Sequence, residues 1–115
     1  MNTRAMNLRR LVNQEIQMIL YRNCISGTRE EIVDPSTSDL SDSMILCGSF
    51  NPLHEGHIKL AQQAAFQAGK QQMIFELAIV NADKGATEES IVHRRSDQFH
   101  TEGLNLLLTA QPFFY

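Results

Sequence analysis

The chain has 115 residues, of which 43% are hydrophobic and 20% are charged, and its formal net charge is −3. These values predict one small globular unit with a modest core. The mildly acidic balance gives no reason to expect nucleic acid or a membrane as a partner. Cys24 and Cys47 lack the spacing of a zinc or disulfide framework. We therefore expect a reducing compartment, the cytoplasm, with the mitochondrion or nucleus as alternatives.

The N-terminal segment, residues 1–23, carries a helical pattern. Between residues 4 and 22, apolar side chains recur at the spacing of one helix face: Leu8, Leu11, Val12, Ile16, Ile19 and Leu20. This pattern predicts an amphipathic helix that packs on a neighbouring surface. Three arginines precede the first acidic residue, Glu15, as in a mitochondrial transit peptide, which is the alternative interpretation.

Residues 24–43 differ in composition from the rest of the chain. Pro35 lies among serine, threonine and aspartate, and apolar side chains show almost no periodicity. This composition predicts a flexible linker. We therefore expect the ordered domain to occupy residues 44–115.

Within residues 44–115, short apolar runs alternate with helical patterns. The expected elements are a strand at 44–47, a helix at about 57–68, a strand at 73–80, a helix that starts near Thr87, and a strand at 104–109. Gly69 and Gly103 are suited to end the two helices. The predicted class is α/β, a partial Rossmann-like, doubly wound parallel sheet that amounts to one β-α-β-α-β half.

The loop after the first of these strands, GSFNPLHEGH at residues 48–57, is the part of the chain best suited to chemistry. Gly48 and Gly56 lack the Cβ atom that would keep a phosphate or base away from the backbone. Ser49, Asn51 and the free N–H groups of the first helical turn are donors for phosphate oxygens. The loop lies at the carboxyl end of a buried strand, where open α/β sheets bind nucleotides.

His54 and His57 are three residues apart at the start of the helix, so both imidazoles can converge on one anion. Their expected task is to donate hydrogen bonds to charge that develops on phosphate oxygens during transfer. A metal pair is the alternative, but the sequence offers no third ligand, and no metal site is predicted.

GSFNPLHEGH resembles the GxFxPxHxGH signature of the nucleotidylyltransferase superfamily, the cytidylyltransferase-like enzymes with an HxGH motif. Its members join a nucleoside monophosphate from ATP or CTP to a phosphate-bearing acceptor and release pyrophosphate. Asn51, Pro52 and His54 are similar to the residues of nicotinamide or nicotinate mononucleotide adenylyltransferases. The resemblance covers about residues 44–115.

The resemblance implies roles for individual residues. His54 and His57 would bind nucleotide phosphates and stabilise the transition state. The nucleotide would also be bound by loop residues, namely Gly48, Ser49, Phe50, Asn51 and Gly56. Mg²⁺ would accompany ATP and assist the departure of pyrophosphate.

Asn81 and Lys84 follow the second strand of the expected sheet at the same carboxyl edge. Lys84 is therefore a candidate to meet the phosphate of the acceptor, a phosphorylated small molecule. The alternative for Lys84 is an ordinary solvated loop lysine.

Full-length relatives of this superfamily carry a further ISSTxxR-like segment that binds the triphosphate, and this sequence lacks it. The resemblance therefore implies a C-terminally truncated member. An inactive nucleotide-binding or interaction module, which self-associates through an open sheet edge, is the second hypothesis. An unrelated flavodoxin-like domain with a chance motif is the third.

Overall fold

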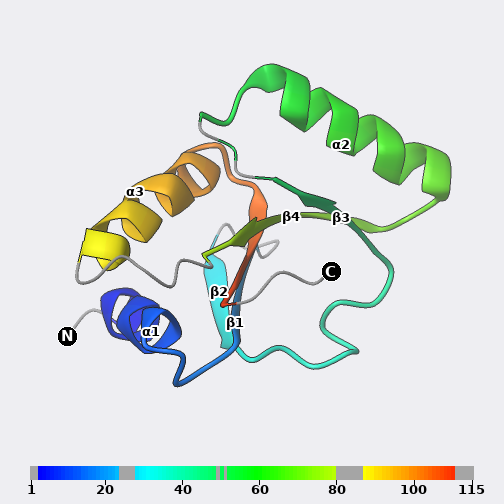
Figure 1. Cartoon of the computed structure of the whole chain (residues 1–115). Helices are drawn as coiled ribbons and strands as arrows, with labels where there is room; N and C mark the ends of the chain where they lie inside the picture. The colour runs from blue at the N-terminus through cyan, green and yellow to red at the C-terminus, as the bar shows by residue number, and fades with distance from the viewer. Residues whose placement is uncertain (1–2, 24–27, 49, 51, 80–86, 111–115) are drawn as a thin grey trace.

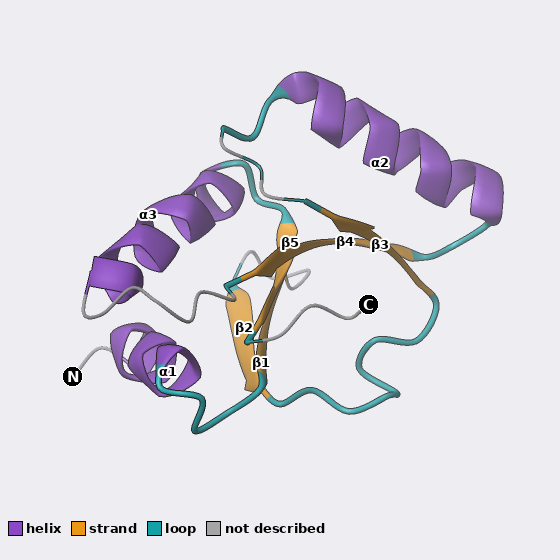
Figure 2. Cartoon of the chain, viewed as in Figure 1, coloured by secondary structure: helices purple, strands orange, loops and turns teal. Residues whose placement is uncertain are grey.

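The computed structural model describes residues 3–23, 28–48, 50, 52–79 and 87–110. Its elements, in chain order, are α1 (Thr3–Val12), β1 (Met18–Asn23), β2 (Arg29–Val33), β3 (Ser43–Cys47), α2 (Glu55–Ala68), β4 (Gln72–Ala78), α3 (Thr87–Thr101) and β5 (Asn105–Thr109). The five strands form one sheet (Figure 2). In the described part of the chain, no helix is both long and apolar enough to cross a bilayer.

The sheet has the strand order β2-β1-β5-β4-β3. β3, β4 and β5 are parallel neighbours, and α2 and α3 connect them in turn. This arrangement confirms the predicted β-α-β-α-β half of a Rossmann-like fold. β1 continues the sheet as an antiparallel neighbour of β5, and β2 is antiparallel to β1. The sheet is therefore mixed, with its parallel part built by the C-terminal half of the chain.

The two helices of the parallel part end as the sequence predicted. Gly69 follows α2 with a φ of 69°, its N–H donates to the Phe66 carbonyl, and the N–H of Lys70 donates to the Ala65 carbonyl. Gly103 follows α3 with a φ of 68°. Glycine adopts this left-handed conformation without a steric penalty, so both helices stop where the next strand requires.

The N-terminal helix was predicted to run through Arg22, and this was wrong. α1 ends at Val12, and Met18–Asn23 forms β1. Gln14 takes the left-handed position with a φ of 61°, and the N–H of Glu15 donates to the Arg10 carbonyl, which closes a Schellman motif. Because glutamine rather than glycine occupies this position, the sequence carried no stop signal there.

The linker predicted for residues 24–43 also needs correction, because Arg29–Val33 forms β2. β2 pairs antiparallel with β1, and Arg22 forms an ion pair with Glu30 across the two strands at 3.2 Å. Charged side chains are usual on an edge strand, where they oppose pairing with another chain. The same charges made this segment resemble a solvated connector. The sheet therefore extends across residues that the sequence divided into helix, linker and domain.

Two apolar clusters cover the two faces of the sheet. The larger one joins all three helices to β1, β4 and β5 and contains, among others, Leu8, Leu11, Ile19, Ala61, Phe75, Phe99 and Leu106. In Figure 1, α1 and α3 lie side by side over one part of this face and α2 lies over β3 and β4. The smaller cluster on the other face is formed by Leu20, Ile74 and Leu107, with Ile45 and Leu40 packed against it.

The placement of β1 in the core can be tested with one leucine. Leu20 is fully buried opposite Leu107, so we expect Leu20→Ala to lower the free energy of unfolding by about 2–5 kcal/mol. The control is Leu60→Ala on α2, where the leucine is 60% exposed, and we expect a change within about 0.5 kcal/mol. Urea unfolding followed by circular dichroism measures both. Equal effects would contradict the assignment of β1 to the sheet.

Candidate functional site

The candidate site is the loop between β3 and α2, at the carboxyl end of β3. The N–H of Gly48 donates to the Glu76 carbonyl on β4 at 3.3 Å, which ties the start of the loop to the neighbouring strand. Four of the predicted site residues lie outside the described residues: Ser49, Asn51, Asn81 and Lys84. Gly48, Phe50, His54, Gly56 and His57 are described, and the structure brings them together at the start of α2.

The ring of Phe50 lies in the middle of this loop and is 4% exposed. It makes edge-to-face contacts with Phe75 and Phe99, with ring centroids at 5.3 and 5.4 Å, and with His57 at 5.0 Å. Its backbone has a φ of 44°, a conformation that is costly for a residue with a side chain. Phe50 therefore anchors the loop in the core, a role that the sequence did not indicate.

Gly48 and Gly56 make room for side chains of the same loop. A Cβ atom at Gly48 would lie 3.0 Å from Cζ of Phe50. One at Gly56 would lie 3.0 Å from Cε1 of His54. Real Cβ atoms rarely approach a neighbour so closely, so any larger residue forces a ring to move. The glycines thus let the phenyl and imidazole rings occupy their present positions.

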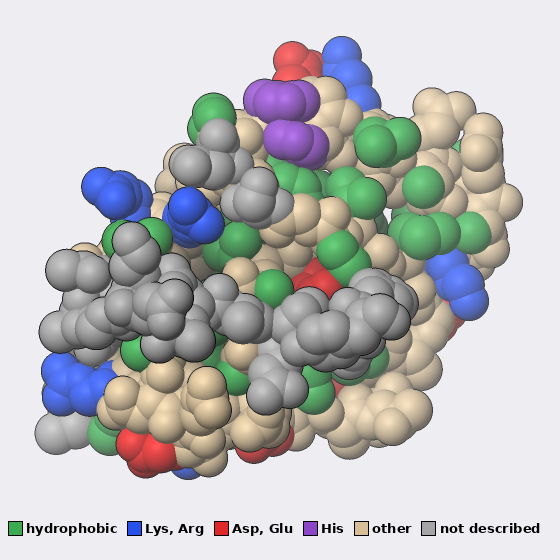
Figure 3. All heavy atoms as spheres, in the orientation of Figure 1, with side chains coloured by type: hydrophobic (Ala, Val, Ile, Leu, Met, Phe, Trp, Pro, Cys, Tyr) green, Lys and Arg blue, Asp and Glu red, His purple; other side chains and the backbone are tan. Residues whose placement is uncertain are grey.

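His54 and His57 lie against one another at the N-terminus of α2. Their rings are stacked, with centroids 3.7 Å apart and planes inclined by 23°. The backbone N–H of His54 donates to Nδ1 of His57 at 3.1 Å. A neutral His57 with Nδ1 as acceptor carries its proton on Nε2, which can donate to a ligand. Figure 3 shows histidine side chains gathered at the surface near the start of α2.

Gln98 on α3 forms hydrogen bonds with the backbone of this loop, and the sequence did not indicate this role. Its Nε2 donates to the Phe50 carbonyl at 2.9 Å, and its Oε1 accepts from the Leu53 N–H at 2.6 Å. One amide therefore bonds to the backbone on both sides of residues 51–52. Nothing in the sequence marks this glutamine, because a polar residue on an amphipathic helix normally faces water.

A pocket of about 660 Å³ lies beside His54, between the loop and the C-terminal end of α3. Its lining is partly apolar, with Leu53 and Ile58, and partly polar, with Gln98 and Thr101. Glu55 and Glu102 add two carboxylates. Because carboxylates repel phosphate, this pocket suits an uncharged group such as a base or sugar better than a polyphosphate.

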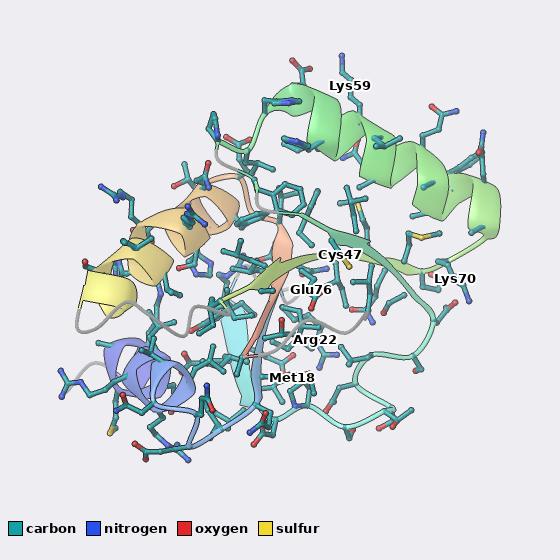
Figure 4. The ribbon with its side chains drawn as sticks, viewed as in Figure 1. Met18, Arg22, Cys47, Lys59, Lys70 and Glu76 are labelled. Carbon is teal, nitrogen blue, oxygen red and sulfur yellow. The ribbon has the colours of Figure 1, made fainter. Side chains whose placement is uncertain are left out.

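Glu76 is a buried carboxylate below the loop, 2% exposed, and it accepts a hydrogen bond from the Thr109 hydroxyl at 2.8 Å. Cys47 lies opposite it in the register of β3 and β4, and Figure 4 shows the two side chains near one another. Partial desolvation of the thiol, followed by the hydrogen bond and negative charge of Glu76, raises the pKa of Cys47 to about 12, although the residue as a whole is exposed. The thiol therefore stays protonated at neutral pH.

The helix face of the sheet has a second polar pocket, of about 310 Å³, lined by Arg4, Tyr21, Arg29, Glu30, Glu31 and His100. Glu31 accepts a hydrogen bond from the Tyr21 hydroxyl at 2.8 Å, and burial followed by this bond raises the pKa of Tyr21. Burial and the nearby charges of Arg4 and Arg29 lower the pKa of His100 to about 4. These groups join α1, β1 and β2 to α3. No set of three or more metal-ligating side chains occurs among the described residues.

The anchoring role of Phe50 gives a stability prediction. We expect Phe50→Ala to lower the free energy of unfolding by about 3–5 kcal/mol, because the phenyl ring is buried and alanine keeps the cost of the left-handed backbone. Phe66→Ala is the matched control, since Phe66 is 85% exposed and should change stability by less than about 0.5 kcal/mol. Chemical denaturation of both variants compares them, and similar losses would contradict the anchor.

The raised pKa of Cys47 gives a reactivity prediction. In a Cys24→Ser background, we expect iodoacetamide to react with Cys47 at pH 8 far more slowly than with free cysteine, because the raised pKa keeps this exposed thiol protonated. Removing the negative charge with Glu76→Gln should lower the pKa and speed the reaction. The alkylation rate against pH, followed by mass spectrometry, measures the effect. A rate like that of free cysteine in the unmutated site would contradict this account.

Comparison with known proteins finds a family and a relative that part of this chain resembles. The family model described as cytidylyltransferase-like matches residues 45–96. A probable nicotinate-nucleotide adenylyltransferase from Carboxydothermus hydrogenoformans is 39% identical over 70 residues, which are 61% of this chain and 32% of that protein. The chain thus spans about a third of the length of this curated relative. No solved structure gives a significant match. These matches support the resemblance carried by GSFNPLHEGH, and residues 45–96 are similar to the cytidylyltransferase-like family.

Proposed function

We propose that this chain carries the nucleotide-binding half-site of a nucleotidylyltransferase. The observation that supports it most directly is the stacked pair His54 and His57, 3.7 Å apart at the N-terminus of α2 and at the carboxyl end of β3. A helix N-terminus offers free N–H groups and positive potential to an anion. Two imidazoles at the same place add donors that a phosphate group can use.

In the proposed reaction, a phosphate oxygen of the acceptor attacks the α-phosphorus of MgATP in line. The bond from the α-phosphorus to the bridging oxygen breaks, and pyrophosphate leaves with that oxygen. No covalent bond to the protein forms. Mg²⁺ enters with the nucleotide as part of the substrate, because phosphate oxygens are its usual ligands in such reactions.

His54 and His57 would donate hydrogen bonds to the oxygens of the α-phosphate, on which negative charge builds in the transition state. Nε2 of His57 is suited to this because Nδ1 already accepts from the His54 N–H. The loop residues Gly48, Ser49, Phe50, Asn51 and Gly56 would bind the nucleotide. The pocket beside His54 would take its uncharged base or ribose.

The acceptor we propose is a phosphorylated small molecule such as nicotinamide or nicotinate mononucleotide. This choice follows the sequence resemblance and the name of the bacterial relative, probable nicotinate-nucleotide adenylyltransferase. ATP is the proposed donor, with CTP as the alternative. Asn81 and Lys84 remain the proposed contacts for the acceptor phosphate.

The alternative function is nucleotide binding without turnover. It is favoured by the position of the described donors, because the histidine pair and the N-terminus of α2 offer hydrogen bonds and positive potential at a single point. Binding a phosphate group needs donors at one such point, whereas phosphoryl transfer also needs stabilisation of the charge on the departing pyrophosphate.

The proposal is tested by pyrophosphate release and ATP affinity. With MgATP and nicotinamide mononucleotide, we expect wild type to release pyrophosphate and His57→Ala to be slower by about 10²–10³-fold, the range for removal of one transition-state donor. The matched control is His93→Ala, because His93 pairs with Asp97 on α3, and its activity should equal that of wild type. Isothermal titration calorimetry measures ATP binding to each protein. ATP binding without release supports the alternative, and neither binding nor release by wild type overturns both functions.

A further inference from the structure

We propose that Gln98 is a positioning residue that fixes the orientation of the His54–His57 pair. It lies on α3, far from the loop in sequence, yet its amide donates to the Phe50 carbonyl at 2.9 Å and accepts from the Leu53 N–H at 2.6 Å. Gln98 therefore acts as a bridge between α3 and the loop.

Each of the two loop residues that Gln98 bonds to is adjacent to one of the histidines. Leu53 precedes His54, so the bond to the Leu53 N–H fixes the peptide from which His54 begins α2. Phe50 contacts the ring of His57 edge to face, with centroids 5.0 Å apart. A shift of the Phe50 backbone therefore moves the aromatic ring against which His57 rests.

Gln98 stabilises a backbone conformation of Phe50 that is unfavourable by itself. Phe50 has a φ of 44°, in the left-handed region that residues other than glycine rarely adopt. Such a residue stays there only when its surroundings hold it. The amide of Gln98 bonds to the carbonyl of this same residue, at the point where the backbone would otherwise relax.

Gln98 also anchors its own amide to α3, since its Nε2 donates to the Arg95 carbonyl at 3.1 Å. Its neighbour Phe99 is fully buried against Phe50 and Phe75. The bridge is therefore built on a helix that the core holds in place. Because the core fixes α3, a side chain on this helix can keep the backbone of the loop in one position, as a positioning residue must.

Two substitutions separate the functions of the amide. Gln98→Met keeps the length of the side chain and removes both hydrogen bonds. Gln98→Glu keeps an acceptor for the Leu53 N–H but cannot donate to the Phe50 carbonyl. Gln67→Met is the matched control, because Gln67 is exposed on α2. Thermal melting by circular dichroism first establishes that each variant is folded.

The decisive readout is nuclear magnetic resonance of the histidine rings and of the Leu53 amide. In wild type we expect a slowly exchanging Leu53 N–H and a neutral His57 with its proton on Nε2. In Gln98→Met we expect Leu53 exchange to be at least about tenfold faster and the His57 nitrogen shifts to move towards mixed tautomers. Gln98→Glu should retain Leu53 protection but show the altered His57 shifts. A structural role alone would lower the melting temperature and leave the His57 shifts in place.

The expected effect of Gln98 on nucleotide binding rests on the proposed function, and it is measured separately. We expect Gln98→Met to weaken ATP binding about tenfold, while Gln67→Met binds like wild type. If wild type binds no ATP, the proposed function fails, and the ring and amide measurements still decide the role of Gln98. Unchanged His57 shifts and Leu53 exchange in a folded Gln98→Met protein would overturn the inference.

Discussion

The loop that carries the histidines depends on the burial of one aromatic ring. Phe50 packs against Phe75 and Phe99 although its backbone is in the left-handed region. Such a conformation costs on the order of 1–3 kcal/mol, and full burial of a phenyl group contributes about 1.5–3 kcal/mol. Because these values are similar, neither decides the conformation alone. The two hydrogen bonds from Gln98, at about 0.5–1.5 kcal/mol each, are large enough to decide it.

The parallel half of the sheet could be predicted from the sequence because its boundaries have local signals. Gly48 ends an apolar run, and Gly69 and Gly103 end helices in left-handed conformations that glycine adopts freely. Each strand between these points is a short, strongly apolar segment. Local chemistry and tertiary structure agree at every one of these positions, so a reading of the sequence alone places the elements to within one or two residues.

The N-terminal half could not be predicted in the same way, because its structure depends on partners distant in sequence. Ile19 and Leu20 fit a helix face as well as they fit a strand, and pairing with β5, near the other end of the chain, decides between them. Gln14 ends α1 without the glycine that usually marks such a point. β2 is a charged edge strand, which becomes recognisable only when β1 lies beside it.

The candidate site, too, could be predicted from the sequence only in part. The spacing of His54 and His57 was sufficient to predict that they lie together, since a helix start brings residues three apart onto one side. The sequence could not show that Gly48 makes room for the ring of Phe50, because the position of that ring depends on the strained backbone of Phe50. The match to the cytidylyltransferase-like family ends at residue 96, before Gln98. The geometry of the histidine pair therefore rests partly on a contact outside the segment that matches the family model. A protein with the same motif but another residue at this point of α3 would need a different support for its loop.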